Sequence, residues 1–507
     1  MATTTEQPGG GEVLRSERIA GGILPKVLNS FDMVAIFVAI VLFISNAGVI
    51  PGAGAAAFVY WILGFLTFLI PGAIVTGQLG LMFPGEGSIY VWTNKAFGPF
   101  LGFFAGFCAW WPGVLVMIAT GDAVVTLIQQ LGSQYSANLL TEPWQQGLVI
   151  VLVIAFSFVL SVLRFRVTQN FVNIVFLAYG GAILLIGLAG LLWLLGGHAP
   201  QADFSAPSWG LNGNNYTFFG LVILALLGIE VPLNMGVEIN DVRAITRYLL
   251  WGSVVVMAAY LIGTFGVMMA VPASDQGNPS AVAEAVQKGF GGAGTIIGTI
   301  VNLIFIGFFI FNTAVYNYSF GRLIFVSGLD RRLPPVMSKV NANRVPWVAV
   351  LIQSIISVTF TIVTFILAPA VTNVLASADL TTVIYDILQA AVTVIWCVSM
   401  VILFIDVIII RFKYHEAFTR IRLAPDWVFY LCSVLGLVAS GFGVYVTFLS
   451  PWTNTPTKTL MTTSQWDIWI GGIGVLSLIV GIVIFFIGQA TIKGEVSDEE
   501  IIREVTG

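Results

Sequence analysis

The stretch SNAGVIPGAG, Ser45 to Gly54, lies inside an apolar segment that runs from residue 33 to 57. Its three glycines and Pro51 are incompatible with one continuous helix, because glycine weakens a helix and an internal proline removes a backbone hydrogen bond. The stretch LGIEVPLNMG, Leu227 to Gly236, interrupts a second apolar segment, residues 216–238, in the same way. The sequence therefore predicts two interrupted helices.

The composition places these helices in a membrane. Of 507 residues, 58% are hydrophobic and 9% are charged, whereas a soluble domain has roughly 25% charged residues. The apolar segments are continuous and about 20 residues long, which suits membrane-spanning helices and not the alternating strands of a barrel. We predict an all-α integral membrane protein with twelve transmembrane helices. The predicted spans are residues 33–57, 59–83, 98–131, 147–163, 168–196, 216–238, 248–271, 293–326, 347–368, 381–410, 427–450 and 467–488.

The two interruptions divide the chain into matching halves. Gly48 and Gly228 are 180 residues apart (228 minus 48), with four predicted spans between the interrupted ones. This pattern is typical of transporters built from inverted repeats. We expect five parts: an N-terminal tail (1–32), a first repeat (33–196), a second repeat (216–410), two further spans (427–488) and a C-terminal tail (489–507).

The basic residues predict the orientation. With the N-terminus inside, 19 of the 21 Lys and Arg residues fall in inner segments, and only Lys288 and Lys458 fall outside. Because positive residues favour the cytoplasmic side, both tails are expected in the cytoplasm and the protein in the cell membrane.

Interrupted helices offer a way to bind a zwitterion. The break exposes unpaired N–H groups, which attract a carboxylate, and unpaired C=O groups, which attract an ammonium group. An α-amino acid carries both groups on one carbon. The candidate substrate-binding residues around the breaks are Ser45, Asn46, Ala47, Gly48, Gly228, Ile229 and Glu230. The alternative is that Gly and Pro merely kink packed helices.

Three acidic residues inside predicted spans are candidates for proton coupling or gating. Glu230 lies near the expected midplane beside the second break, and Asp122 and Asp386 lie in the third and tenth spans. A charged side chain at this depth is costly, so each calls for a function or a partner. The alternatives are a Glu230 that bonds freed backbone, and structural polar bridges for Asp122 and Asp386.

Other classes of function find no support in the sequence. The chain has no zinc-protease motif, nucleophile elbow or ATP-binding loop, and Cys108, Cys397 and Cys432 have no metal-ligand spacing. No basic stripe suggests nucleic acid. We predict no enzyme activity, no cofactor and no metal site, and we expect the bilayer and a small amino acid or amine as partners. The oligomeric state stays open, and a sensor with a transporter fold is the alternative from another class.

Three motifs resemble the amino acid/polyamine/organocation (APC) superfamily of transporters. They are PGEGSIYVWTNKAFGP at 84–99, Gly228-Ile229-Glu230 followed by Glu238, and Gly321-Arg322 followed by LDRRLPP at 329–335. The resemblance implies a leucine-transporter-type fold, with two inverted five-helix repeats, two further helices and alternating access. It also implies that Trp110, Met117 and Tyr316 face the substrate.

The stretch Leu66–Pro112 is similar to the bacterial glutamate/GABA antiporter branch of this superfamily. Two positions depart from relatives. Asn46 stands where many members have glycine, and Leu224 where arginine exchangers have a gating Trp. Residues 168–196 contain no Lys, which some proton-coupled relatives carry in the fifth span. We therefore expect exchange of one amino acid for another, with proton-coupled uptake of an amino acid or polyamine as the alternative.

Overall fold

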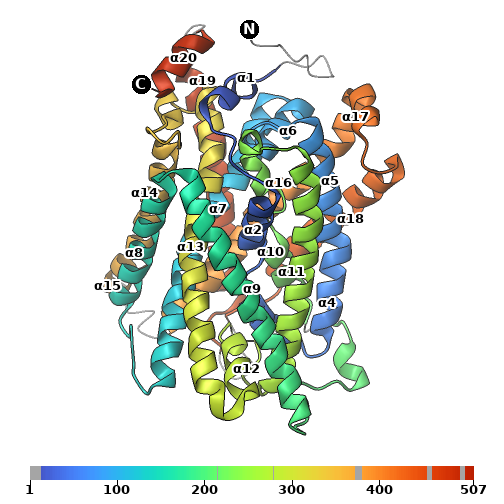
Figure 1. Ribbon diagram of the computed structural model, residues 1–507, viewed down its shortest axis with the longest axis vertical. Helices are drawn as coiled ribbons and strands as arrows, with labels where there is room; N and C mark the ends of the chain where they lie inside the picture. The colour runs from blue at the N-terminus through green and yellow to red at the C-terminus, as the bar shows by residue number, and fades with distance from the viewer. Residues whose placement is uncertain are drawn as a thin grey trace.

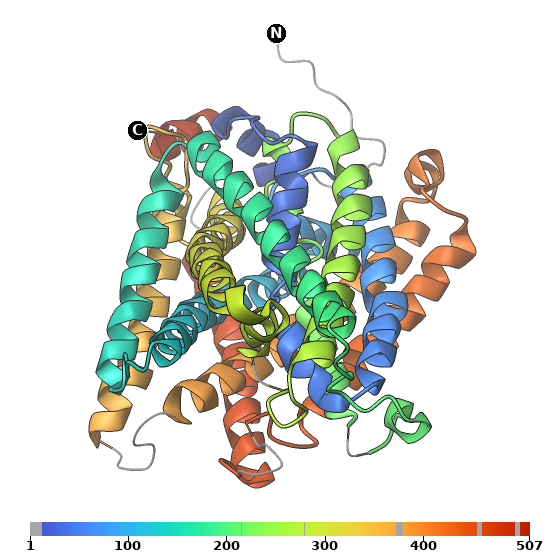
Figure 2. The same ribbon diagram turned by 60° about the horizontal axis from the view of Figure 1, so that its bottom comes forward.

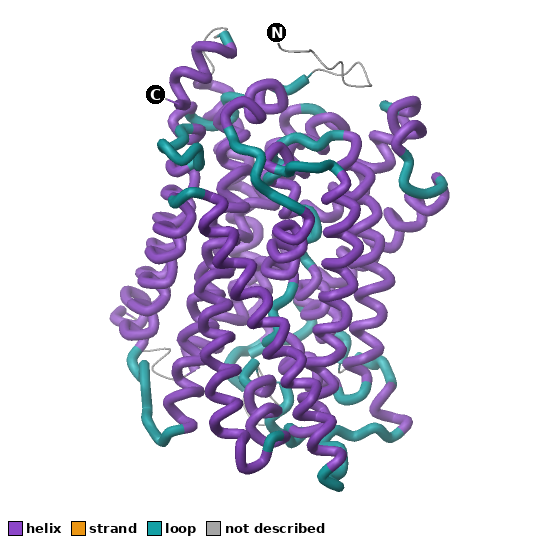
Figure 3. The backbone as a smooth tube through the Cα atoms, in the orientation of Figure 1, coloured by secondary structure: helices purple, strands orange, loops and turns teal. Residues whose placement is uncertain are grey.

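The computed structural model describes residues 13–213, 215–277, 279–371, 379–453, 459–491 and 497–506. These residues are mainly helical, and they form no β-strand beyond two isolated bridges. Figure 1 shows the helices as a bundle, and Figure 3 shows irregular segments running between them at mid-height. Lys458 and parts of both predicted tails lie outside the described residues.

Eleven helices are long and apolar enough to cross a membrane, or up to twelve if a bent pair counts as one span. This confirms the predicted all-α membrane fold. The spanning helices, with their short extensions, are α2 (Ser30–Val41) with α3 (Asn46–Val49) and η1 (Ile50–Ala53), α4 (Ala56–Gly64) with η2 (Phe65–Leu69) and α5 (Ile70–Met82), α7 (Pro99–Gln134), α8 (Pro143–Val162), α9 (Phe165–Leu195), α10 (Thr217–Leu226) with η4 (Val231–Asn234), α11 (Arg243–Ala270), α13 (Gly294–Leu329), α14 (Trp347–Ile362) with η8 (Val363–Leu367), α16 (Asp379–Lys413), α18 (Asp426–Thr447) and α19 (Thr463–Thr491).

Shorter helices connect or flank these spans. They are α1 (Arg15–Ile23), α6 (Ser88–Phe97), η3 (Ala206–Trp209), η5 (Gly236–Glu238), α12 (Ala281–Gly289), η6 (Gly291–Ala293), η7 (Pro335–Ser338), α15 (Ala368–Val371), α17 (His415–Ile421) and α20 (Asp498–Thr506).

Both apolar segments are interrupted, the second at its predicted stretch and the first at residues 42–45, just before most of the predicted stretch 45–54, which forms α3 and η1. The pair α2 and α3–η1 bends by 45°, and residues 42–45 between them, here called the first break, are not helical. Residues 227–230, here called the second break, separate α10 from η4. Glycine and proline disfavour the helix on one side of each break. The breaks interrupt two helices that are otherwise long enough to span a bilayer.

Small residues let the central helices approach closely, as in other membrane bundles. α7 and α13 pack along each other. A Cβ atom on Gly113 of α7 would lie 2.6 Å from the ring of Phe320 of α13, and one on Gly121 would lie 2.9 Å from Ile150 of α8. Substitution at these glycines would push the helices apart.

The first and last described helices, α1 and α20, lie at the same end of the bundle, here called the terminal end (Figures 1 and 2). The two predicted tails contain helices there that the hydropathy did not indicate. Ile19 and Ile23 of α1 are buried, as are Ile501 and Val505 of α20, and Asp498 of α20 forms an ion pair with Arg18 of α1. Amphipathic faces of short helices therefore cover part of the terminal end.

Candidate functional site

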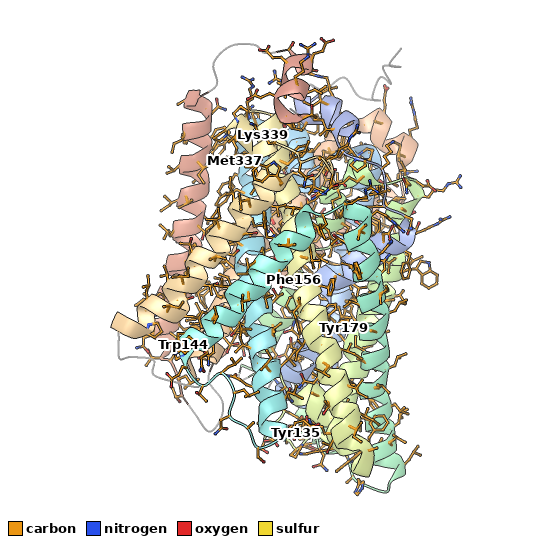
Figure 4. The ribbon with its side chains drawn as sticks, turned by 60° about the vertical axis from the view of Figure 1, so that its left-hand side comes forward. Tyr135, Trp144, Phe156, Tyr179, Met337 and Lys339 are labelled. Carbon is orange, nitrogen blue, oxygen red and sulfur yellow. The ribbon has the colours of Figure 1, made fainter. Side chains whose placement is uncertain are left out.

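The backbone of the first break is bonded by the protein's own tyrosines. Three hydroxyl groups from α9, α11 and α13 donate to the last carbonyl groups before the break. The pairs are Tyr316 to Ile40 (2.6 Å), Tyr260 to Val41 (2.8 Å) and Tyr179 to Leu42 (2.9 Å). Figure 4 shows Tyr179 at mid-height of the bundle. These three carbonyl groups are therefore satisfied without a ligand.

Two N–H groups of the first break are bonded by two of the same tyrosines, whereas Ser45 N donates no hydrogen bond within the described residues. Phe43 N donates to the Tyr260 hydroxyl (3.1 Å), and Ile44 N donates to the Tyr179 hydroxyl (3.0 Å). The Tyr260 hydroxyl also lies 3.0 Å from the carbonyl oxygen of Ala225 at the end of α10. Tyr260 thus joins the two interrupted spans. The sequence analysis named Tyr316 but missed Tyr179 and Tyr260, although a tyrosine in mid-span requires a partner for its hydroxyl.

The second break leaves polar backbone atoms free. Gly228 has a φ of +101°, a conformation that suits glycine. A Cβ atom there would lie 2.4 Å from Ile40 and 3.2 Å from the ring of Trp396. Within the described residues, the N–H groups of Gly228 and Ile229 donate no hydrogen bond. Two adjacent donors are therefore available at this break.

Glu230 adds a half-satisfied carboxylate beside these donors. The indole N–H of Trp396 donates to Glu230 Oε1 (2.9 Å), whereas Oε2 has no partner among the described residues. The side chain is buried, at 1% exposure. A buried, unpaired carboxylate oxygen is unfavourable unless a proton or a cation reaches it. Trp396 was not anticipated from the sequence, because an indole in mid-span also fits simple packing.

A small cavity of about 20 Å³ lies between the two breaks, which is room for about one water molecule. The bundle is therefore closed around the candidate site. The cavity is lined by Ile40, Val41, Phe43, Asn46, Val116, Leu224, Ala225, Leu227, Tyr316, Gln389, Val392 and Trp396. Asn46 and Tyr316 of the predicted set are among them, and Gln389 is a polar lining residue that the sequence analysis missed.

Trp110 and Met117 are placed away from this cavity. The Trp110 indole donates to Gln353 Oε1 of α14 (2.9 Å), and Gln353 Nε2 donates to Met117 Sδ (3.2 Å). The neighbouring Val116 lines the cavity instead. In this closed conformation the α7 residues expected to face the substrate therefore pack against α14.

The remaining predicted residues of the first break are buried in its turns. Ser45, Ala47 and Gly48 are buried, and the Gly48 carbonyl accepts a hydrogen bond from Gly277 N (3.0 Å). The Ser45 side chain interacts with the hydroxyl of Tyr385 on α16.

Asp122 and Asp386 lie close enough to interact electrostatically. Asp122 of α7 is 1% exposed, and neither of its carboxylate oxygens has a partner among the described residues. Tyr385, next to Asp386 on α16, interacts electrostatically with both and accepts a hydrogen bond from Gln389 (3.1 Å). The two carboxyl groups therefore lie beside the cavity rather than in its lining.

A second buried group of charges lies toward the terminal end. It consists of Arg322, Glu86 and Glu238 and is here called the Arg322 group. Arg322 of α13 bonds Glu238 of η5 (Nη2 to Oε1, 2.9 Å) and lies 3.8 Å from Glu86 of the α5–α6 loop. All three side chains are at most 1% exposed. Burial raises the pKa of Glu86, and the neighbouring charge of Glu238 raises that pKa further. Arg322 is thus buried in an ion pair rather than solvated.

Among the described residues no group of three or more His, Cys, Asp or Glu is placed to hold a metal ion. The second break offers two free N–H donors and a free carboxylate oxygen within three consecutive residues. Gly228, Ile229 and Glu230 do not line the cavity themselves, but Leu227, which precedes them, and Trp396, which bonds Glu230, both line it. This arrangement suits a small molecule that carries an ammonium group.

Comparison with known proteins agrees with a transporter. The amino acid permease family model matches residues 27–476. A protein of Lactococcus lactis subsp. lactis (strain IL1403) named as a probable agmatine/putrescine antiporter, AguD, is 24% identical over 68% of this chain and 72% of its own. The serine/threonine exchanger SteT of Bacillus subtilis (strain 168) is 25% identical over 60% of this chain and 67% of its own. The polyamine transporter PUT1 of Oryza sativa subsp. japonica is 35% identical over 19% of each chain.

The family match covers most of the chain, including both breaks and the Arg322 group. It confirms that the protein is a multi-pass membrane transporter of amino acids or amines and not an enzyme. The protein belongs to the amino acid permease family of the APC superfamily.

Proposed function

We propose that the protein exchanges one small amino acid for another by alternating access. The observation that carries this proposal is the pair of opposite free groups at the second break. The N–H groups of Gly228 and Ile229 suit the substrate carboxylate, and the free Oε2 atom of Glu230 suits its ammonium group. Asn46 and Gln389, which line the cavity, are proposed to contact the side chain of the substrate.

Movement is part of this proposal, because the cavity of about 20 Å³ is too small for an amino acid. The other residues of the predicted set, Ser45, Ala47, Gly48, Trp110 and Met117, are proposed to contact substrate only after the two five-helix halves (33–196 and 216–410) shift. The terminal end is proposed to face the cytoplasm, since 19 of the 21 basic residues group there on the predicted topology.

The test is counterflow in proteoliposomes, with purified protein and a panel of amino acids, their methyl esters and their decarboxylated amines. Amino acids are expected to drive counterflow, and esters to compete poorly, because they lack the negative charge that the free N–H groups attract. Equal competition by esters and amines would contradict the carboxylate clamp. Substrate binding without any counterflow would favour a sensor.

A second candidate is transport of a polyamine, with uptake driven by protons. Asp122 and Asp386 favour it, because they place two further carboxyl groups beside the site and Asp122 has no partner among the described residues. Two of the relatives also carry amine or polyamine names. In the same panel, this candidate predicts that diamines and polyamines outcompete amino acids. None of the three relatives described above carries a glutamate/GABA name, so that branch stays a prediction.

A further inference from the structure

The Arg322 group holds together segments that must separate if a path opens at the terminal end. Gly87 N donates to Asn234 O (3.0 Å), and Val237 N donates to Glu86 Oε2 (3.2 Å). A Cβ atom on Gly236 would lie 2.3 Å from the carbonyl oxygen of Gly85. The loop before α6 is therefore in direct backbone contact with the segment that follows the second break.

The same segment is tied to the start of the first interrupted span. Val27 N and Leu28 N both donate to the Glu238 carbonyl oxygen (2.9 Å each), and Asn240 N donates to Leu28 O (2.9 Å). Glu238 thus contacts the chain before α2 through its backbone and α13 through its carboxylate. Opening between these elements would expose Glu86, Glu238 and Arg322 to water together.

The charges inside this group do not balance. Two carboxyl groups face one guanidinium group, so the fully ionised group carries one net negative charge at 0–1% exposure. The guanidinium also packs over the ring of Phe165 (5.0 Å) and donates to the carbonyl oxygen of Tyr318 (2.9 Å). Neither contact adds positive charge, and a buried uncompensated charge is costly.

The charged groups on the neighbouring elements have partners of their own. Glu17 forms an ion pair with Lys95 (2.7 Å), and Asp32 forms one with Arg166. Asp330 accepts hydrogen bonds from Ser16 (2.7 Å) and from Tyr90 (2.9 Å), and Arg332 lies near Tyr90. None of these cations lies within ion-pair distance of Glu86 or Glu238 in the described part of the chain. A proton is the remaining means of neutralising the extra charge.

Two unpaired atoms mark the place for that proton. Glu86 Oε1 and Glu238 Oε2 are buried without a hydrogen-bond partner among the described residues, and both carboxyl groups lie beside the same guanidinium group, at 3.8 and 2.9 Å, close enough to interact with each other. We infer that Glu86 and Glu238 share one proton when the terminal end is closed, and release it when that end opens. This proton site is separate from Glu230 and links protonation to the conformational cycle.

The sign of the pH effect follows from this linkage. Burial raises the pKa of both Glu86 and Glu238, so the closed arrangement binds the proton more tightly than the open one. The stabilisation that the shared proton gives to the closed terminal end is fully present below the ordinary pKa of a glutamate. It is lost as the pH rises through the raised pKa of the pair.

The test is amide hydrogen exchange in lipid nanodiscs without substrate, so its result does not depend on the proposed function. The protection factors of residues 83–88 and 235–239 are compared between pH 6 and pH 9, after correction for intrinsic exchange. In the wild-type protein they are expected to fall as the pH rises, by up to about tenfold per pH unit, which is the slope for one bound proton. In Glu86→Gln they should stay high and nearly independent of pH, because a neutral amide donates to Glu238 without a proton to lose.

Glu238→Gln provides a second variant, since it also leaves one carboxylate for one guanidinium, and it should flatten the profile in the same way. The matched control is Glu284→Gln, which removes an ion pair with Lys288 on α12 at the opposite end of the bundle and should keep the wild-type profile. The inference is overturned if wild-type protection does not change with pH. It is also overturned if Glu86→Gln and Glu238→Gln both follow the wild-type profile.

Discussion

The two breaks look alike in the sequence but are completed in different ways. At the first break, the hydroxyls of Tyr179, Tyr260 and Tyr316 bond three successive carbonyl groups and two N–H groups, and among the described residues the N–H group of Ser45 stays free. The second break keeps two free N–H groups and the free Oε2 atom of Glu230. The comparison teaches that an unwound helix is not a binding site in itself. Only the polar groups that the protein leaves unpaired are available to a ligand.

The largest effect is expected from Gly228→Ala. The added methyl group meets Ile40 at 2.4 Å in a backbone conformation that disfavours a side chain. The free N–H groups should therefore be displaced, and substrate affinity should fall at least about a hundredfold, on the order of 3 kcal/mol. Isothermal titration calorimetry measures this. Gly307→Ala on α13 is the matched control, because a Cβ atom there has no neighbour within 4 Å. Equal substrate affinity in both variants would refute the placement of the substrate at the second break.

A smaller effect, and one on stability, is expected from Tyr260→Phe. Loss of the hydroxyl leaves Phe43 N and Val41 O without their partner, at a cost of about 1–3 kcal/mol for each unsatisfied group. The melting temperature should fall clearly below that of the wild-type protein in the same detergent. Tyr445→Phe serves as control, because Tyr445 is 61% exposed. If Tyr260→Phe has the same melting temperature as Tyr445→Phe, the Tyr260 hydroxyl does not stabilise the first break.

The smallest effect is expected from Asp122→Asn on amino acid exchange. Asp122 lies outside the cavity lining and, unlike Glu230, forms no hydrogen bond to a lining residue in the described part of the chain, so the counterflow rate of an amino acid should change less than about twofold, under 0.5 kcal/mol. A polyamine substrate would behave differently, because it would lose one carboxylate partner. Counterflow of both substrate classes in the same vesicles separates these outcomes, and a selective loss of polyamine transport would favour the second candidate function.

Hydropathy predicted most of the membrane spans to within a few residues. The predicted span 98–131 corresponds to Pro99–Gln134, and 168–196 to Phe165–Leu195. The short helices α1 and α20 were missed, because their apolar residues form one face and not a continuous run. α6 was missed because its ten residues are too few to span a bilayer. The interruptions themselves were visible, since Gly and Pro act on the local backbone.

The partners of the breaks were not predictable. Tyr179 and Trp396 are separated from the backbone or carboxylate that they bond by 137 and 166 residues, respectively. A sequence shows that a mid-span side chain has a polar end, but not which distant group it reaches. For the same reason the sequence suggested that Trp110 faces the substrate, whereas its indole bonds Gln353, 243 residues away.

The central claim is that the free carboxylate oxygen of Glu230 binds the ammonium group of the substrate. The direct measurement is calorimetric affinity for Glu230→Gln against wild type, with the methyl ester of the same substrate as a second ligand. Glutamine still accepts the Trp396 hydrogen bond, so the variant should keep its melting temperature and bind both the amino acid and its methyl ester at least about tenfold more weakly, on the order of 1.4 kcal/mol. Unchanged affinity in Glu230→Gln would contradict the claim.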